Sequence, residues 1–88
     1  MVEHLLKSDT RTVQQENIRV VYNLIFRNAL YSIECYKENS DLKNSMNYCL
    51  LEDITDDEGE AESFLQRMAR GKVLPVHIHD MVVDFFRT

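Results

Sequence analysis

The sequence predicts an α+β fold in which an antiparallel sheet of three or four strands is followed by two C-terminal helices packed on one of its faces. Apolar and polar residues alternate with a period of two in the first half of the chain, whereas apolar residues recur three and four positions apart in the second half. Because the strand patterns precede the helical ones, the two kinds of element should be segregated rather than interleaved. The 88 residues, 44% of them hydrophobic, suffice for one small domain.

We expect this domain to span residues 16–88, and residues 1–15 to form an N-terminal arm. The arm is polar apart from one small apolar cluster, so it is either flexible or adds a fourth strand to the sheet. Three strands with one apolar face are not stable alone, and the segments that follow must therefore cover that face.

Residues 18–27 and 30–37 predict the two strands of a hairpin. In the first segment every second residue is large and apolar, and these residues are Ile18, Val20, Tyr22, Leu24 and Phe26. The second segment places Tyr31, Ile33 and Cys35 on one face. Asn28, between the two, tolerates the left-handed conformation that a tight turn requires. After a polar loop, residues 46–54 predict a third strand.

The first predicted helix covers about residues 56–70. Thr55 and Glu58 match the capping-box pattern, and the acidic residues at the start of the helix suit the positive end of its dipole. A single apolar stripe runs through Ala61, Phe64, Leu65, Met68 and Ala69. Gly71 stands where a left-handed residue would end the helix.

A second helix is predicted to begin at Pro75, because proline favours the first helical position. Its apolar arc consists of Ile78, Met81, Val82, Phe85 and Phe86, and its polar arc includes His77, Asp80 and Asp84. The connection between the helices is short, so we expect them to pack on the sheet as a hairpin or corner.

Composition argues against several classes of function. Fifteen acidic residues against ten Lys and Arg give a net charge of −5, and the basic residues are scattered, so nucleic acid is not an expected partner. No segment approaches the roughly 18 apolar residues of a membrane span, and no secretion signal is recognisable, so we expect a cytoplasmic protein without a membrane partner. Cys35 and Cys49 lie in apolar stretches outside any CxxC motif, which favours buried thiols.

The C-terminal half resembles a family of small bacterial proteins, found mainly in anaerobic Gram-positive bacteria and known as a domain of unknown function. That family has a D-I-S/T-D step into a helix and a closing P-x-H-x-x-D-x-x-x-D-F helix. The matching positions are Asp53, Ile54, Thr55 and Asp56, followed by Pro75, His77, Asp80, Asp84 and Phe85. The chain departs from the family at Leu74, where a serine-like cap is usual. The resemblance covers roughly residues 20–88 and implies a fold but no activity.

His77, Asp80 and Asp84 form the one cluster with metal-ligand or acid–base chemistry, since they share a helix face while His79 points away from it. The set offers a single nitrogen ligand, whereas transition-metal sites use more nitrogen or sulfur. No nucleophile motif or phosphate-binding glycine loop is present. We therefore predict no cofactor and no enzymatic activity, and a metal-dependent or hydrolytic site at these three residues is the alternative.

The start of the first predicted helix is strongly acidic, and its residues are Asp56, Asp57, Glu58, Glu60 and Glu62. Their spacing does not fit a calcium-binding loop, because glycine does not fall at the sixth position. The structural interpretation is a solvated helix start that suits the dipole. The functional interpretation is an acidic patch that docks on a basic protein, including an inhibitor that mimics nucleic acid.

The leading hypothesis is a small, non-enzymatic regulatory or adaptor module that acts by protein–protein contact, with an unidentified protein partner and as a homodimer. Its expected contact residues are the acidic helix start and the polar arc formed by His77, Asp80 and Asp84. The chain also has more apolar residues than one small core readily hides, namely Val21, Ile25, Leu30, Tyr36 and Val83. This surplus is either ordinary surface or an interface.

Overall fold

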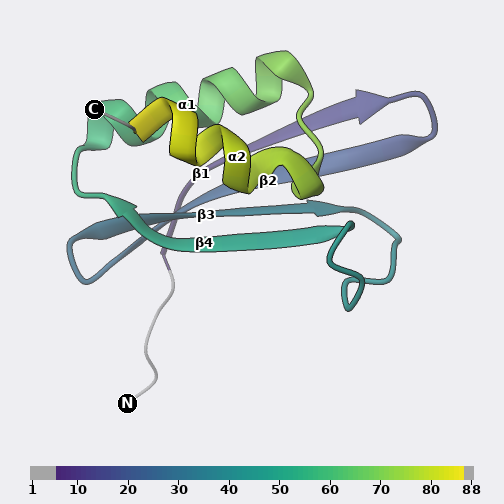
Figure 1. Cartoon of the computed structure of the whole chain (residues 1–88), viewed down its shortest axis with the longest axis horizontal. Coiled ribbons are helices and arrows are strands. Elements are labelled where there is room, and N and C mark those ends of the chain that lie inside the picture. The colour runs from purple at the N-terminus through teal and green to yellow at the C-terminus, as the bar shows by residue number, and fades with distance from the viewer. Residues whose placement is uncertain (1–5, 87–88) are drawn as a thin grey trace.

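Four antiparallel strands lie side by side in chain order, and two helices cover one face of the sheet in this computed structural model (Figure 1). The structure describes residues 6–86. The elements are β1 (Leu6–Gln15), β2 (Ile18–Arg27), β3 (Leu30–Lys37), β4 (Tyr48–Thr55), α1 (Glu58–Gly71) and α2 (Pro75–Phe86). The α+β class and the order of strands and helices are as the sequence predicts. Neither helix in the described part of the chain has the length and apolar character of a membrane span.

The N-terminal segment adopts the second of the two arrangements expected for it. Residues 6–15 form β1 and pair with β2 along its length, so the four-stranded alternative is the one observed. The remainder of the expected arm, residues 1–5, lies outside the described residues. A one-residue slip would turn every side chain of a strand to the opposite face, and the alternating apolar pattern of β2 is what fixes the register.

The β2–β3 hairpin is confirmed. Its two-residue turn consists of Asn28 and Ala29, with φ angles of 54° and 67°. Two successive left-handed residues make the kind of turn whose twist matches that of paired strands. Asn28 was expected in this conformation, whereas alanine rarely adopts it, so Ala29 could not be assigned from residue type.

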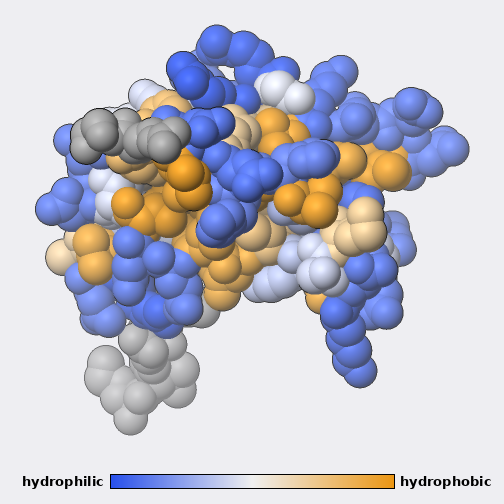
Figure 2. Space-filling model, in the orientation of Figure 1, coloured by the Kyte–Doolittle hydropathy of each residue, from blue (hydrophilic) through white to orange (hydrophobic). Residues whose placement is uncertain are grey.

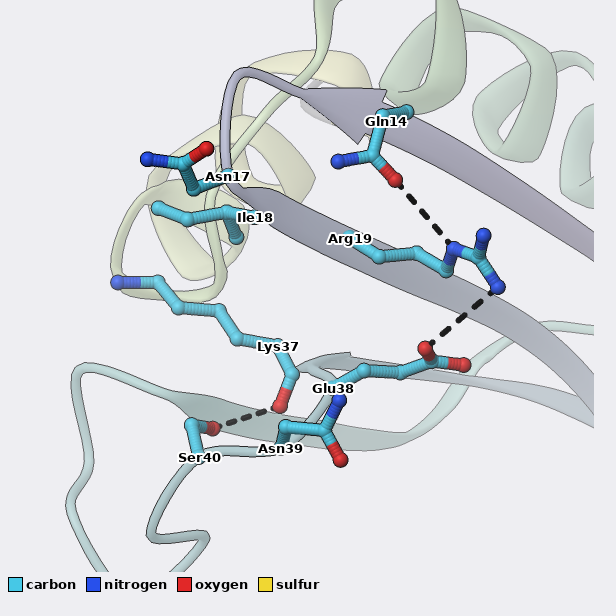
Figure 3. Close-up of a pocket in the computed structure, with 8 residues that line it drawn as sticks. All are labelled: Gln14, Asn17, Ile18, Arg19, Lys37, Glu38, Asn39 and Ser40. Atoms are coloured by element: carbon cyan, nitrogen blue, oxygen red, sulfur yellow. Dashed lines mark hydrogen bonds and ion pairs between the residues drawn. The ribbon is translucent and has the colours of Figure 1, made fainter.

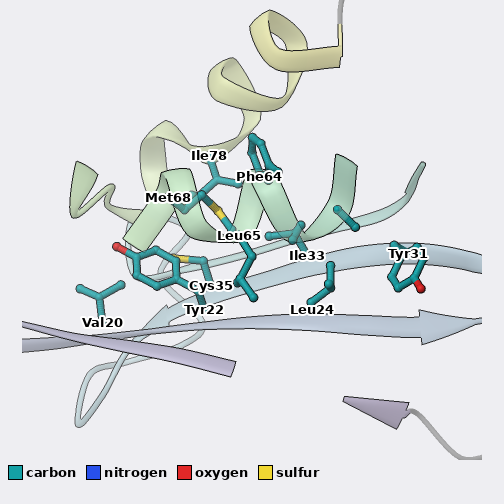
Figure 4. Close-up of a cluster of buried hydrophobic side chains, with 11 residues drawn as sticks. Val20, Tyr22, Leu24, Tyr31, Ile33, Cys35, Phe64, Leu65, Met68 and Ile78 are labelled. Carbon is teal, nitrogen blue, oxygen red and sulfur yellow. The ribbon is translucent and has the colours of Figure 1, made fainter. Parts of the chain in front are cut away.

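The hydrophobic core lies between the sheet and the helices. One face of the sheet, here called the covered face, carries the buried side chains Val20, Tyr22, Leu24, Tyr31, Ile33 and Cys35 (Figure 4). Against them pack the apolar stripes of the two helices, with Ala61, Phe64, Leu65, Met68 and Ile78 fully buried. α1 lies over β1 and β2, and α2 lies over β3 and β4. The Tyr22 hydroxyl donates to the Val73 carbonyl at 2.6 Å and ties the sheet to the connection between the helices.

Both ends of α1 differ in detail from the sequence-based expectation. Asp57, not Thr55, is the N-cap, and its carboxylate accepts from the Glu60 amide at 2.9 Å. The Thr55 hydroxyl instead donates to the Glu60 carboxylate at 2.9 Å, so Thr55 supports a cap two residues further on. At the other end Lys72, not Gly71, is left-handed, with φ 52°. Its amide donates to the carbonyl groups of Ala69 and Met68. Carbonyl groups of the last turn are therefore satisfied although no glycine occupies the position.

Candidate functional site

The three residues of the expected polar arc line one open depression on the helix side of the molecule. His77, Asp80 and Asp84 border a hollow of about 460 Å³ that also includes Lys72 and the end of β1. Within residues 6–86 no three His, Cys, Asp or Glu side chains lie close enough to hold a metal ion. The imidazole nearest Asp80 belongs to His79, at 3.8 Å between Nδ1 and Oδ1. The structure therefore groups the expected residues around one depression without bringing their ligand atoms together.

The acidic helix start is exposed, but some of its carboxylates already have hydrogen-bond partners within the chain. Asp57 caps the helix and Glu60 is held by Thr55, so two of the five carboxylates have structural partners. A third, Glu62, lies beside Asp9 of β1. Burial, followed by its hydrogen bond with Asp9, raises the pKa of the Glu62 carboxyl above its ordinary value of 4.5. The hydrogen bond from Arg11, at 2.7 Å in the ion pair, lowers the pKa of Asp9.

Replacing Glu62 is expected to change how stability depends on pH. An acid with a raised pKa binds more protons in the folded state than in the unfolded state, so its contribution to stability falls as the pH rises through about 4.5 and above. Glu62→Gln should raise the melting temperature at neutral pH and make the chain lose less stability between acidic and neutral pH. Thermal melts across that range test this. Glu58→Gln removes an equal charge one turn earlier and should give a clearly smaller gain, because repulsion by Glu58 is the smallest cause of the raised pKa of Glu62. Equal behaviour of the two variants would contradict the assignment.

A second hollow, with a volume of about 490 Å³, lies at the end of the sheet, between the β1–β2 turn and the end of β3 (Figure 3). Its two cationic side chains do not converge. The Arg19 guanidinium lies between Gln14 and Glu38, at 3.5 and 3.7 Å, whereas the Lys37 side chain extends the opposite way (Figure 3). Because Glu38 already compensates the charge of Arg19, this hollow does not present a concentrated positive charge to an anion.

The open face of the sheet, which no helix of the described chain covers, carries a hydrogen-bonded row across all four strands. The Thr10 hydroxyl donates to the Asn23 side-chain oxygen at 2.8 Å, and the Asn23 amide donates to Glu34 at 2.8 Å. The Tyr48 hydroxyl donates to the second Glu34 oxygen at 2.9 Å. Asn23 is fully buried although it lies on this face. Every member of the row has a partner, so it acts as a rigid polar brace across the sheet.

Beside this row the open face is apolar and slightly hollowed. Val21 and Ile25 are buried there with no covering layer from the described chain. A small hollow of about 120 Å³ opens next to Glu34, and the ion pair between Arg27 and Glu52, 2.8 Å long, lies at its rim. Burial, with the hydrogen bond to Glu34, raises the pKa of Tyr48 to about 12, so this hydroxyl remains a donor at neutral pH.

The free edge of β4 presents unpaired backbone groups. β4 pairs only with β3 in the described part of the chain. The Lys37 amide donates to the Asn47 carbonyl and the Asp53 amide donates to the Ser32 hydroxyl, each at 3.0 Å, so the odd-numbered residues of β4 turn their backbone toward β3. By the alternation of an antiparallel ladder, the backbone groups of Tyr48, Leu50 and Glu52 point outward.

Exposed apolar side chains accompany this edge. Leu50 on β4 is 41% exposed, and Val76 and Val83 on α2 are 42% and 47% exposed. The two valines lie two helical turns apart and share a helix face with Asp80, which stands four residues after Val76 and three before Val83. Hydrophobic side chains reach the surface along α2 and toward β4 (Figure 2). We call the outward backbone of β4, together with Leu50 on the open face of the sheet and Val76 and Val83 on the helix side, the β4–α2 edge.

The chain matches a known protein family. Its whole length, residues 1–88, matches the model of a family described as "Family of unknown function (DUF6514)". The chain belongs to this family. No curated protein and no solved structure matches the chain significantly. Membership in the DUF6514 family therefore brings no activity with it, and the geometry of this chain must carry any functional argument.

The two cysteines of this DUF6514 chain are directly opposite each other on β3 and β4. Both are free thiols, with Cys35 buried as expected and Cys49 half-buried. Burial raises the pKa of Cys35 to about 12 and also raises that of Cys49, so both thiols stay protonated at neutral pH. Because the thiolate is the reactive form, neither is poised as a nucleophile.

Sequence reasoning missed the polar row and the β4–α2 edge of this DUF6514 chain. One signal was available: Asn23 and Glu34 are polar residues in the middle of otherwise apolar strands. Their pairing follows from the register, in which Asn23 is opposite Glu34. The free edge carries no comparable signal, because which strands end a sheet depends on topology rather than on residue type.

Proposed function

We propose that the chain is a non-enzymatic module that acts by protein–protein contact, through the β4–α2 edge. The observation that carries the proposal is the coincidence of outward backbone groups on β4 with three exposed apolar side chains, Leu50, Val76 and Val83. An exposed edge strand is a template for pairing with another chain, and proteins that do not use such an edge protect it. The free thiols are consistent with a reducing compartment, and the proposal includes a cytoplasmic location.

The regions expected from the sequence support this contact less strongly. In the acidic helix start, the Asp57 carboxylate caps α1 and the Glu60 carboxylate accepts a hydrogen bond from Thr55, so both already have partners within the chain. The depression lined by His77, Asp80 and Asp84 is open and holds both a lysine and these carboxylates, so its charges partly offset one another. We therefore place the principal contact at the β4–α2 edge and keep the acidic residues as a source of preference for a basic partner.

The proposal is tested by capturing binding proteins with the full chain and two matched variants. Val83→Lys places a charge on the β4–α2 edge, and Ile18→Lys places the same charge on an apolar side chain of similar exposure, 38%, at the other end of the sheet. We expect a stoichiometric protein partner, which includes an untagged second copy of this chain, that Val83→Lys loses and Ile18→Lys retains. Capture of the same proteins by all three, or of none in stoichiometric amount, would contradict the proposal.

A further inference from the structure

We infer that the protein which occupies the β4–α2 edge is a second copy of this chain, joined by antiparallel pairing of β4 with β4 into one continuous eight-stranded sheet. The inference rests on the proposed function, and it specifies the partner and the geometry. Four lines of evidence support it: the contrast between the two edges of the sheet, the self-complementarity of β4, the placement of α2, and the direction in which α2 runs.

The two edges of the sheet are protected to different degrees. β1 has an irregular register between Lys7 and Asp9, and it carries the ion pair of Asp9 with Arg11 at 2.7 Å. Bulges and charged side chains are the usual devices that prevent an edge strand from pairing. β4 also has an irregular register, beyond Leu51, where Asp53 is left-handed with φ 56°, but its segment from Tyr48 to Leu51 pairs regularly with β3 and carries no charged side chain. Charged side chains thus disfavour pairing at β1, whereas the regular, uncharged segment of β4 is available to pair.

β4 is complementary to itself about Leu50. A two-fold axis through this residue places the outward backbone groups of Leu50 opposite those of Leu50 in the second copy, in register for a hydrogen-bonded pair. The same axis sets Tyr48 opposite Glu52 of the second copy, so no like charges face each other across the junction. The side chains of Tyr48 and Leu50 lie on the open face, where the polar row and the small hollow extend to the axis.

The helix layer fits the same arrangement. α2 lies over β3 and β4 rather than over the middle of the sheet. Neighbouring strands are about 4.8 Å apart, so a helix centred above β3 and β4 would lie about 10 Å from its symmetry mate, close to the usual 8–10 Å between packed helices. Pairing through β4 therefore brings the two α2 helices into packing distance without moving either domain.

The direction of α2 decides which of its residues meet. α2 runs alongside β4 in the same direction (Figure 1). A two-fold axis through Leu50 consequently sets the first half of one α2 against the second half of the other. Val76 then approaches Val83 of the second copy, beside the exposed Asp80 that shares their helix face, and the two exposed valines of each chain become buried together. The dimer would cover the apolar side chains that define the β4–α2 edge.

Sedimentation equilibrium of the purified full chain at micromolar concentrations tests the inference. The wild type is expected to be a dimer, and Leu50→Lys and Val83→Lys are each expected to raise the dimer dissociation constant by about 100-fold, because each charge enters the interface twice. Ile18→Lys, the matched control, should leave the constant unchanged. Both edge positions are exposed, and circular dichroism verifies that each variant remains folded.

Three results would overturn the inference: a monomeric wild type, a dimer that neither edge variant weakens, and a dimer that Ile18→Lys weakens equally. These outcomes are separable from failure of the proposed function. A monomer that still captures a different protein, and loses it in Val83→Lys but not in Ile18→Lys, would overturn pairing with a second copy and leave protein contact at the β4–α2 edge in place. Capture and self-association that are both insensitive to Val83→Lys would overturn both.

Discussion

Phe64→Ala is expected to lower the free energy of unfolding by about 3–5 kcal/mol, the cost of removing a fully buried phenylalanine. Phe64 has no exposed surface and links the two helices. Its ring centroid lies 5.2 Å from that of Phe85 and 5.5 Å from that of Phe86, both on α2. An 88-residue chain is stable by only about 4–13 kcal/mol in total, so this variant should lose a large share of its stability. Urea denaturation measures the loss.

Phe26→Ala is the matched control for this prediction. Phe26 is an aromatic residue at the end of the sheet, stacked on Tyr31 at 4.7 Å but 37% exposed. Its removal should cost about 1–1.5 kcal/mol, since it gives up an aromatic pair without opening an enclosed cavity. A loss for Phe64→Ala no greater than that for Phe26→Ala would show that α2 is not held by this aromatic cluster.

Asn23→Ala is expected to cost about 2–3 kcal/mol, because it removes a hydrogen bond to a charged carboxylate from a buried site. Asn23 is the central member of the polar row, and its amide donates to Glu34 at 2.8 Å while its oxygen accepts from Thr10. Its loss separates the β1 side of the row from the β3 and β4 side. Chemical denaturation of the variant gives the change in stability.

A double-mutant cycle isolates the bond itself. The cycle combines Asn23→Ala with Glu34→Ala and compares the pair with the two single variants. Residues that share a hydrogen bond should show a coupling free energy of about 1–3 kcal/mol. Additive single effects would mean that the row is a set of independent contacts rather than a connected brace.

The fold could be predicted largely because local patterns and tertiary packing agree. The alternation in β2 and the stripe of α1 each mark the face through which the sheet and the helices pack, although β2 is buried on both faces from Val20 to Ile25. β1 was harder to assign, because residues 6–15 are polar and join the sheet through pairing with β2 rather than through an apolar pattern of their own. The observed caps of α1 lie one or two residues from the predicted ones. At the start of the helix, Asp57 and Thr55 can both accept a backbone hydrogen bond, and packing selects between them.

The candidate site could be predicted less well. His77, Asp80 and Asp84 share a helix face, as their spacing predicts, and they do border one depression. Spacing along one helix cannot supply the ligand atoms that other elements would have to contribute. The β4–α2 edge joins a strand and a helix that are separated in sequence by the whole of α1, and its exposure follows from the position of β4 at the end of the sheet.

The most direct test of pairing at β4 is hydrogen exchange of its backbone amides, resolved by residue. The amides of Leu50 and Glu52 point away from β3, and those of Cys49 and Leu51 serve as internal references because they face β3. We predict that Leu50 and Glu52 are protected at concentrations where the chain is dimeric, and that dilution or Val83→Lys removes this protection while the references keep theirs. Rapid exchange of Leu50 and Glu52 at every concentration would contradict pairing through β4.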